Sequence, residues 1–326
     1  MIGLTGFGAR FGARFVAGFS ARFCARFGAR FVGLVGFAGL LALATGVEAQ
    51  PNGLAETLRA QFVSRIEAVA GAAEGVVGYV VVDLSSGERF TRLDTVQFPT
   101  ASTIKLAILY EVMKQADEGR VALDETAPLD RARAVPGGLL YELSRPSLSP
   151  RDLAVAMILQ SDNTATNVLI DRVGMAAINA RMKSLGLAGT ALRRHMIDTE
   201  AARRGDENVA TPSDLARLLQ VFHAGEGLSA TSKASALEIL KKFKQTPIRA
   251  GVPSDVAVAS KSGELDGVRA DAGIVYLEGR PYIFVAMATY LGDSPQPSAP
   301  LEALARASYD YFSRRATVSG YGRQLR

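Results

Sequence analysis

The chain has 326 residues, 48% of them hydrophobic and 21% charged, which is enough apolar material for one large or two small domains with a buried core. Most of its formal net charge of +5 lies in residues 1–49, which contain five arginines and one glutamate. The remainder is nearly neutral, so nothing in its charge points to a nucleic-acid partner. One cysteine, Cys24, and two histidines, His195 and His223, are too few for a structural zinc site, so we expect no metal and no cofactor.

The first 49 residues are typical of an export leader. Arginines precede an apolar run, Phe31–Ala44, and Val47-Glu48-Ala49 offers a cleavage site before Gln50. The run has 14 residues, whereas a membrane span needs about 20. We therefore predict a signal peptide over 1–49, a periplasmic or secreted location, and a monomeric mature chain that does not bind the membrane. An uncleaved anchor, an amphipathic membrane-surface segment and a start codon assigned too early are the alternatives.

Hydrophobic periodicity and turn residues predict the elements of the mature chain. In chain order these are a helix at Leu54–Ala70, strands at Gly75–Asp83 and near Arg89, a helix at Ser102–Lys114, helices at Pro150–Gln160, Thr164–Val173 and Pro212–Phe222, strands at Val256–Gly263, Ala272–Leu277 and Tyr282–Leu291, and a helix at Leu301–Arg314. Strands near both ends with helices between them indicate an α+β domain over 50–326, in which residues from about 115 to 250 form a mostly helical part.

The first motif is Ser102-Thr103-Ile104-Lys105. Residues three apart on a helix share a face, so Lys105 can act as the base that removes the proton of the Ser102 hydroxyl. Burial would lower the pKa of the lysine enough for that role. A serine at a helix N-terminus also presents its backbone N–H to a developing oxyanion. Taken alone, the pair is more typical of an ordinary capping serine with a solvated lysine.

The second motif, Ser161-Asp162-Asn163, interrupts two helices. Ser161 is positioned to pass a proton to a departing nitrogen, and Asn163 can both donate to and accept from a substrate amide. We expect Asp162 to cap the following helix, which is a structural role. A simple helix-breaking turn is the alternative for the whole triplet.

The third motif, Lys261-Ser262-Gly263, ends a predicted strand. Lys261 and Ser262 are candidates to bind a substrate carboxylate, and Arg269 is a candidate second anchor for it. Gly263 leaves room for a ligand along the strand edge. The backbone N–H of Glu264 is then the candidate second oxyanion donor. A surface lysine beside a turn is the alternative.

The order and spacing of the three motifs make the chain resemble the class A serine β-lactamase family of penicillin-recognising enzymes. The resemblance spans about 54–314 and includes Leu148–Gly174, Gly205-Asp206 and Thr211-Pro212. It implies a β-lactamase/transpeptidase-like fold, an antiparallel sheet flanked by helices with a mostly helical subdomain. The family's matched positions imply Ser102 as nucleophile, Lys105 as base and Ser161 as proton relay, with Asn163 and Lys261 as substrate contacts.

The sequence departs from the family at the glutamate that carries out deacylation. The family has Arg-x-Glu-Pro-x-x-Asn, and an ungapped alignment places Met196 at the glutamate position and Glu200 at the asparagine position. A methionine cannot orient a water for ester hydrolysis. Glu200, Asp198 and His195 are the candidate replacement bases. Loop ion pairs for the two acids and a packing role for His195 are the alternatives.

Three functions are consistent with these residues. The first is an exported hydrolase that opens β-lactam rings through an acyl-enzyme on Ser102, with slow deacylation. The second is a D-alanyl-D-alanine peptidase or transferase acting on peptidoglycan peptides, which needs the same motifs and no dedicated glutamate. The third is a non-catalytic sensor of β-lactams or muropeptides.

Overall fold

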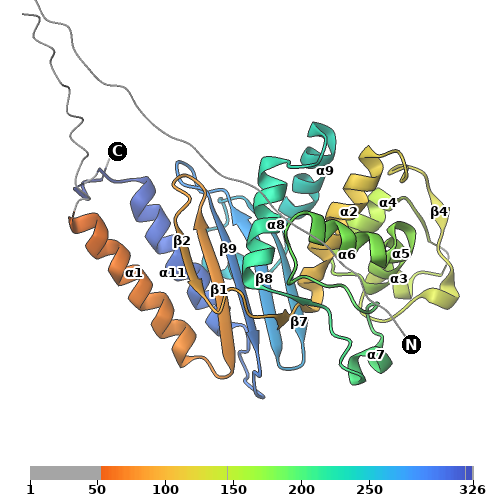
Figure 1. Cartoon of the computed structure of the whole chain (residues 1–326), viewed down its shortest axis with the longest axis horizontal. Helices are drawn as coiled ribbons and strands as arrows, with labels where there is room; N and C mark the ends of the chain where they lie inside the picture. Colours follow the sequence, from red (N-terminus) through yellow and green to blue (C-terminus); the bar gives the residue numbers. More distant parts are fainter. Residues whose placement is uncertain (1–52, 145, 320, 325–326) are drawn as a thin grey trace, which may run out of the picture. The chain divides into compact units, whose positions relative to one another are not determined.

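The computed structural model describes residues 53–144, 146–319 and 321–324, so the predicted leader lies outside the described residues. The predicted α+β architecture is confirmed in the part it describes, where helices lie on both sides of one antiparallel sheet and a helical region adjoins it (Figure 1).

The main sheet has five strands in the order β2-β1-β9-β8-β7, and all neighbours are antiparallel. The strands are β1 (Val76–Asp83), β2 (Arg89–Arg92), β7 (Val258–Leu265), β8 (Val268–Val275) and β9 (Tyr282–Thr289). The central strand β9 is buried over seven consecutive residues, because helices cover both faces of the sheet. Strand β7 is an edge strand, so part of its backbone is free to meet other groups.

Two short ribbons complete the strands. In the first, β3 (Phe98–Pro99) pairs with β6 (Val209–Ala210), and in the second β4 (Ala127–Pro128) pairs with β5 (Ser147–Leu148). The first ribbon matters for the site, because Pro99 leads directly into the turn that carries Ser102.

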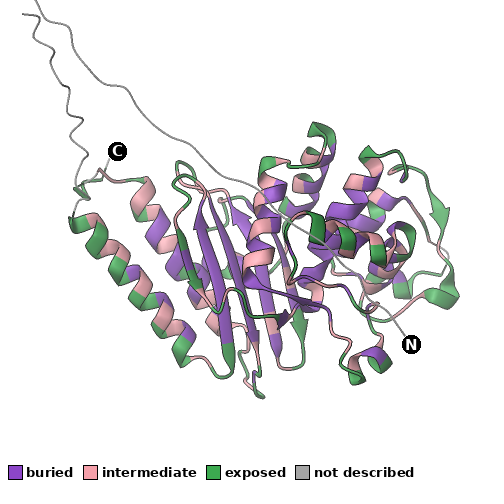
Figure 2. Ribbon diagram, in the orientation of Figure 1, coloured by how far each residue is buried: buried purple, intermediate pink, exposed green. Residues whose placement is uncertain are grey.

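Helices α1 (Gly53–Ala72) and α11 (Ala299–Ala316) pack together on one side of the sheet. Their contact includes Phe62 stacked on Tyr311, with ring centroids 4.3 Å apart. Figure 2 shows the strands largely buried, while α1 has a wide exposed side. This layer stabilises the sheet on the side away from the helical region.

The helical region is built around α2 (Lys105–Asp117), of which ten residues are buried. The other helices of the chain are α3 (Leu139–Glu142), α4 (Pro150–Leu159), α5 (Asn163–Val173), α6 (Met175–Ser184), α7 (Thr199–Arg203), α8 (Pro212–Ala224), α9 (Ala230–Lys241) and α10 (Pro247–Gly251), with 3₁₀ turns η1 (Ala101–Ile104) and η2 (Arg131–Arg133). One hydrophobic core joins α2, α4, α5 and α8 to the sheet.

The predicted helix starts at proline are confirmed. Ser149 forms a capping box with Asp152 at the start of α4, and the Thr211 side chain accepts a hydrogen bond from Asp214 N at the start of α8. The Asp162 carboxylate caps α5 by accepting from Ala165 N, as expected. These caps fix where each helix begins, and the cap at Asp162 fixes the second motif.

Several boundaries differ from the prediction by a few residues, and two of these differences have a clear local cause. Strand β8 begins at Val268 rather than Ala272, because Asp266-Gly267 forms a two-residue hairpin loop in which Gly267 has a φ of +68°. This Asp-Gly signal is present in the sequence. The helix predicted from Ser102 begins instead as the 3₁₀ turn η1 and becomes α-helical at Lys105.

Candidate active site

Ser102 lies on the η1 turn that joins β3 to α2. The residue before it, Ala101, has a φ of +45°, which costs backbone energy in a residue with a Cβ. Among the described residues the Ser102 hydroxyl has no hydrogen-bond partner, and the side chain is half-buried. A strained turn that presents an uncommitted hydroxyl suits a nucleophile.

Lys105, one 3₁₀ turn further, is completely buried. Its Nζ donates to Ser161 O at 2.6 Å, Ser161 Oγ at 3.0 Å and Asn163 Oδ1 at 3.1 Å. Burial lowers the pKa of Lys105 well below its ordinary value, the charge of Lys261 lowers it further, and Asp162 opposes both. The first two motifs therefore meet at Lys105. The three contacts match the three N–H groups of the charged amine, whereas burial shifts the equilibrium toward the neutral amine.

The second motif is held in place by its own turn. Ser161 has a φ of +57°, an uncommon conformation for a residue with a Cβ, and it directs the hydroxyl to Lys105. Asp162 is buried and accepts from Leu140 N at 2.8 Å as well as from Ala165 N. The cap thus also attaches the segment that carries α3.

The segment Val135–Gly138 forms a wall over this turn. Asn163 Nδ2 donates to Pro136 O at 3.0 Å, and Thr164 Oγ1 exchanges hydrogen bonds with the backbone of Val135. A Cβ on Gly138 would lie 2.2 Å from an Asp162 oxygen, so only glycine fits there. Asn163 therefore uses its amide on both sides, toward Lys105 and toward the wall.

The third motif lies on β7 beside η1. Lys261 is 2% exposed, and its Nζ donates to Ser262 O at 2.6 Å. Burial lowers the pKa of Lys261 to about 7; Asp271 opposes that shift and Lys244 adds to it. A Cβ on Gly263 would lie 2.7 Å from Thr100 O and 2.8 Å from Ser102 N. The glycine therefore lets the strand touch the nucleophile's turn, a closer role than the space for ligand that we expected.

Two of the three candidate carboxylate anchors, Ser262 and Arg269, line a cavity of about 250 Å³, whereas the buried Lys261 does not line it. The cavity is bordered by Ser262, Gly263, Glu264 and Arg269, together with residues of the α10 and α11 ends. Arg269 donates to the Leu265 and Val268 carbonyls at 2.8 Å and pairs with Glu264 at 2.7 Å. Four of the residues named from sequence thus lie together, and the Arg269 guanidinium is held at the cavity edge.

Met196 lies in the hydrophobic core and is 7% exposed. Asn167 on α5 holds its main chain at two points, accepting from Met196 N at 2.8 Å and donating to Met196 O at 3.1 Å. The next residue, Ile197, has a φ of +64° and is 46% exposed. The loop is therefore fixed at this position, but the side chain fixed there has no acid–base chemistry.

The candidate replacement bases have local partners. The Asp198 carboxylate caps α7 by accepting from Ala201 N at 2.9 Å. Glu200 is largely exposed and pairs with Arg203. His195 bonds through Nε2 to Asp171 Oδ1 at 2.9 Å. Glu200 thus makes the ion pair stated above as its structural alternative. Asp198 instead caps a helix, and His195 makes a hydrogen bond rather than a packing contact.

Sequence reasoning assigned no role to Asn167 or Asp171. Their spacing from Asn163 carried the signal, because residues at intervals of four lie on one face of α5. All three make side-chain contacts to groups around the site.

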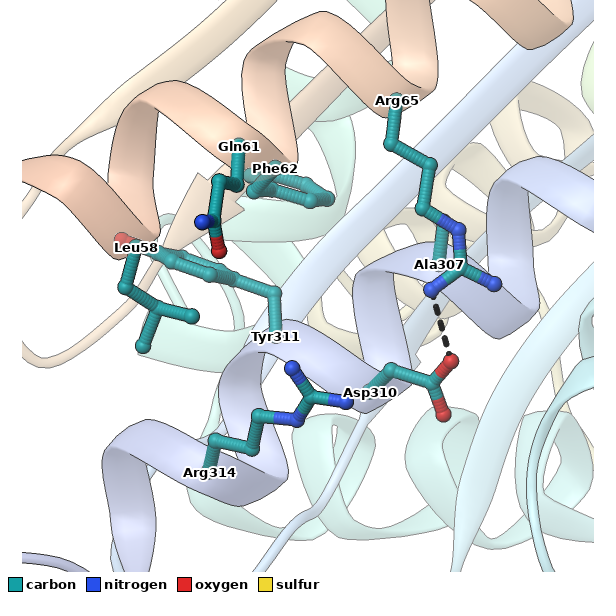
Figure 3. A pocket seen from close by; sticks show the side chains of 8 residues that line it. All are labelled: Leu58, Gln61, Phe62, Arg65, Ala307, Asp310, Tyr311 and Arg314. Carbon is teal, nitrogen blue, oxygen red and sulfur yellow. Dashed lines mark hydrogen bonds and ion pairs between the residues drawn. The ribbon is translucent and has the colours of Figure 1, made fainter. Parts of the chain in front are cut away.

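Other features of the described residues are separate from this site. A hollow of about 160 Å³ lies between α1 and α11, with Arg65 bonded to Asp310 at 2.9 Å on one side (Figure 3). None of the helices described is long and apolar enough to cross a membrane. Within the same residues there is no group of three or more metal-binding side chains.

The antiparallel sheet, the adjoining helices and the Ser102 turn between them are those of the β-lactamase/transpeptidase-like fold. The model of the β-lactamase enzyme family matches residues 61–312. The chain therefore belongs to that family, in its class A-like serine branch.

Relatives and solved structures support the same family. The imipenem-hydrolysing β-lactamase of Enterobacter cloacae is 28% identical over 223 residues, 66% of this chain and 76% of that protein. The β-lactamase of Sphaerobacter thermophilus is 32% identical with a TM-score of 0.70, covering 77% of this chain and 97% of that structure. PBP-A is 30% identical with a TM-score of 0.71, covering 78% and 96%. A mutant of PBP-A has been solved as an acyl-enzyme complex with penicillin G.

Proposed function

We propose that this protein is an exported, monomeric serine hydrolase that opens β-lactam rings through an acyl-enzyme on Ser102 and releases the product slowly. The observation that carries the proposal is the buried Lys105, with its Nζ bonded to Ser161 and Asn163 and its pKa lowered by burial. The relatives named as β-lactamases support the substrate class.

The reaction follows from these groups. Neutral Lys105 takes the Ser102 proton as Oγ bonds to the lactam carbonyl carbon. The backbone N–H groups of Ser102 and Glu264 stabilise the oxyanion. When the C–N bond breaks, the nitrogen takes a proton from Ser161, which recovers one from Lys105. Lys261, Ser262 and Arg269 bind the substrate carboxylate.

Deacylation is the slow step, because Met196 stands where the family resemblance implies a glutamate. Losing a general base typically costs about 10²–10⁴-fold in rate, so the ester would persist but still hydrolyse. Intact-mass spectrometry of residues 50–326 with benzylpenicillin tests this. We expect an adduct that forms quickly and clears slowly, and none on Ser102→Ala. A Ser102→Ala protein that still consumes the drug would contradict the proposal.

A second function, D-alanyl-D-alanine peptidase or transferase, is favoured by the same Met196, because that chemistry does not require the glutamate. Incubating the protein with a peptidoglycan pentapeptide separates the two. Release of D-alanine faster than hydrolysis of benzylpenicillin would make the peptide the substrate and the β-lactam an inhibitor.

A further inference from the structure

One face of α5 makes three successive contacts with groups around the site. Asn163, Asn167 and Asp171 are four residues apart and therefore lie in one row along the helix. Asn163 accepts from Lys105, and Asn167 holds the main chain of Met196. Asp171, the last residue of the row, bonds to two segments that are far apart in the sequence.

The Asp171 carboxylate contacts two loops, each of which also bonds to another residue of this row. Its Oδ2 accepts from Arg133 Nη2, and its Oδ1 bonds to His195 Nε2 at 2.9 Å. Arg133 ends the turn that precedes the wall segment Val135–Gly138, and His195 directly precedes Met196. One side chain therefore contacts both loops at once.

The space between these contacts is hollow. A cavity of about 270 Å³ is lined by Arg133, Asn167, Val168, Asp171 and His195. Because atoms across a cavity make no dispersion contacts, side-chain packing does not hold the two loops together at this place. The contacts of Asp171 with Arg133 and His195 supply the connection instead.

These groups are too remote to take part in the chemistry themselves. Eight residues of helix separate Asn163 from Asp171, which at 1.5 Å per residue is about 12 Å along the axis. A general base must lie within hydrogen-bond reach of its proton or one water away. His195 in this position is therefore not the deacylation base, and its function must be indirect.

We propose that Asp171 is a positioning residue for the reaction at Ser102. By binding Arg133 and His195, it fixes the wall segment, which bonds to Asn163, relative to the Met196 loop, which bonds to Asn167, and so sets the acylation rate. The inference rests on the proposed function, since Asn163 orients both Lys105 and the substrate amide there.

The test is the acylation of Asp171→Ala by benzylpenicillin, followed by rapid-quench intact-mass spectrometry. We expect the second-order acylation constant to fall roughly tenfold, because small errors in positioning lower rates by one to two orders of magnitude. The final fraction of acylated protein should not change. Arg133→Gln and His195→Gln should each give part of the loss, and neither should add to Asp171→Ala. Arg172→Gln, an exposed neighbour on α5, is the matched control.

Hydrogen–deuterium exchange provides a readout that needs no reaction. In Asp171→Ala, amides of residues 131–138 and 194–198 should exchange faster while those of the sheet do not. A wild-type protein that forms no adduct would refute the proposed function, and the exchange data would still decide whether Asp171 fixes the loops. Unchanged exchange, or an unchanged acylation constant in protein that is merely less stable, would overturn this inference.

Discussion

The Lys105 centre and the Met196 loop contact the same face of α5, one turn apart, and differ in the side chain that is held at each place. At the first, three hydrogen bonds and complete burial bring an amine to two polar partners. At the second, Asn167 holds the main chain of residue 196 at two points, but the side chain is a thioether. The comparison teaches that a loop's geometry and its chemistry are separable: the backbone of residue 196 is fixed, but its side chain is neither an acid nor a base.

The largest effect should come from Lys105→Ala, which removes the base at the complete centre. We expect the acylation constant to fall about 10³-fold, within the range typical of a lost general base. Stopped-flow or quenched mass spectrometry with benzylpenicillin measures it. Lys183→Ala, an exposed lysine on α6, is the control. A Lys105→Ala protein that acylates within threefold of wild type would assign the base elsewhere.

Met196→Glu introduces a carboxylate that can act as the general base for deacylation at the fixed position of the loop. Because Asn167 already holds the backbone there, a carboxylate should find a productive position, and burial would raise its pKa toward that of a useful base. We expect the adduct to clear about 10²-fold faster, as measured by its decay in intact-mass spectra. Met196→Gln, similar in size but unable to act as a base, should stay near wild type. Equal decay in the two variants would show that the frame is not catalytically placed.

The pH dependence of acylation sharpens the description of the Lys105 centre. Acylation needs neutral Lys105 and charged Lys261, so its rate constant should follow a bell-shaped profile. Because burial places the pKa of Lys261 at about 7, the rate should fall as pH rises through 7. Lys261→Arg keeps its charge and should move the falling limb well above pH 8. A profile that is the same in both proteins would remove Lys261 from substrate binding.

How much of the fold and the site could be predicted depends on how far apart in the sequence the interacting residues lie. The Ser149 and Thr211 caps, and the spacing of Ser102 and Lys105, depend on neighbouring residues, so the sequence predicts them directly. The role of Gly263 depends on Thr100 and Ser102, which are distant in sequence and were not predictable from the motif. That the three motifs form one site was predicted from the resemblance to class A enzymes, because no pattern in the sequence itself indicates which loops are in contact.

The contacts of Asn167 and Asp171 show the same limit. The helical spacing of these two residues was visible, yet their partners Met196, His195 and Arg133 lie outside α5, on segments distant in sequence. A row of polar residues on a helix usually faces water, so the helical spacing alone did not predict hydrogen bonds from these side chains to loops. Tertiary contacts decide such roles, and only coordinates reveal them.

The smallest effects should come from the other acids of the Met196 loop. Glu200 is largely exposed and pairs with Arg203, and exposed pairs contribute little. Glu200→Gln should therefore leave adduct decay within about twofold of wild type. Asp198→Asn should do the same, because asparagine caps a helix nearly as well as aspartate. Adduct half-life, followed with the melting temperature, distinguishes a lost cap from a lost base. A tenfold longer half-life in either variant, with melting unchanged, would make that residue the deacylation base. The Met196 loop would then hold its catalytic group two or four residues further on, and the contrast with the Lys105 centre would disappear.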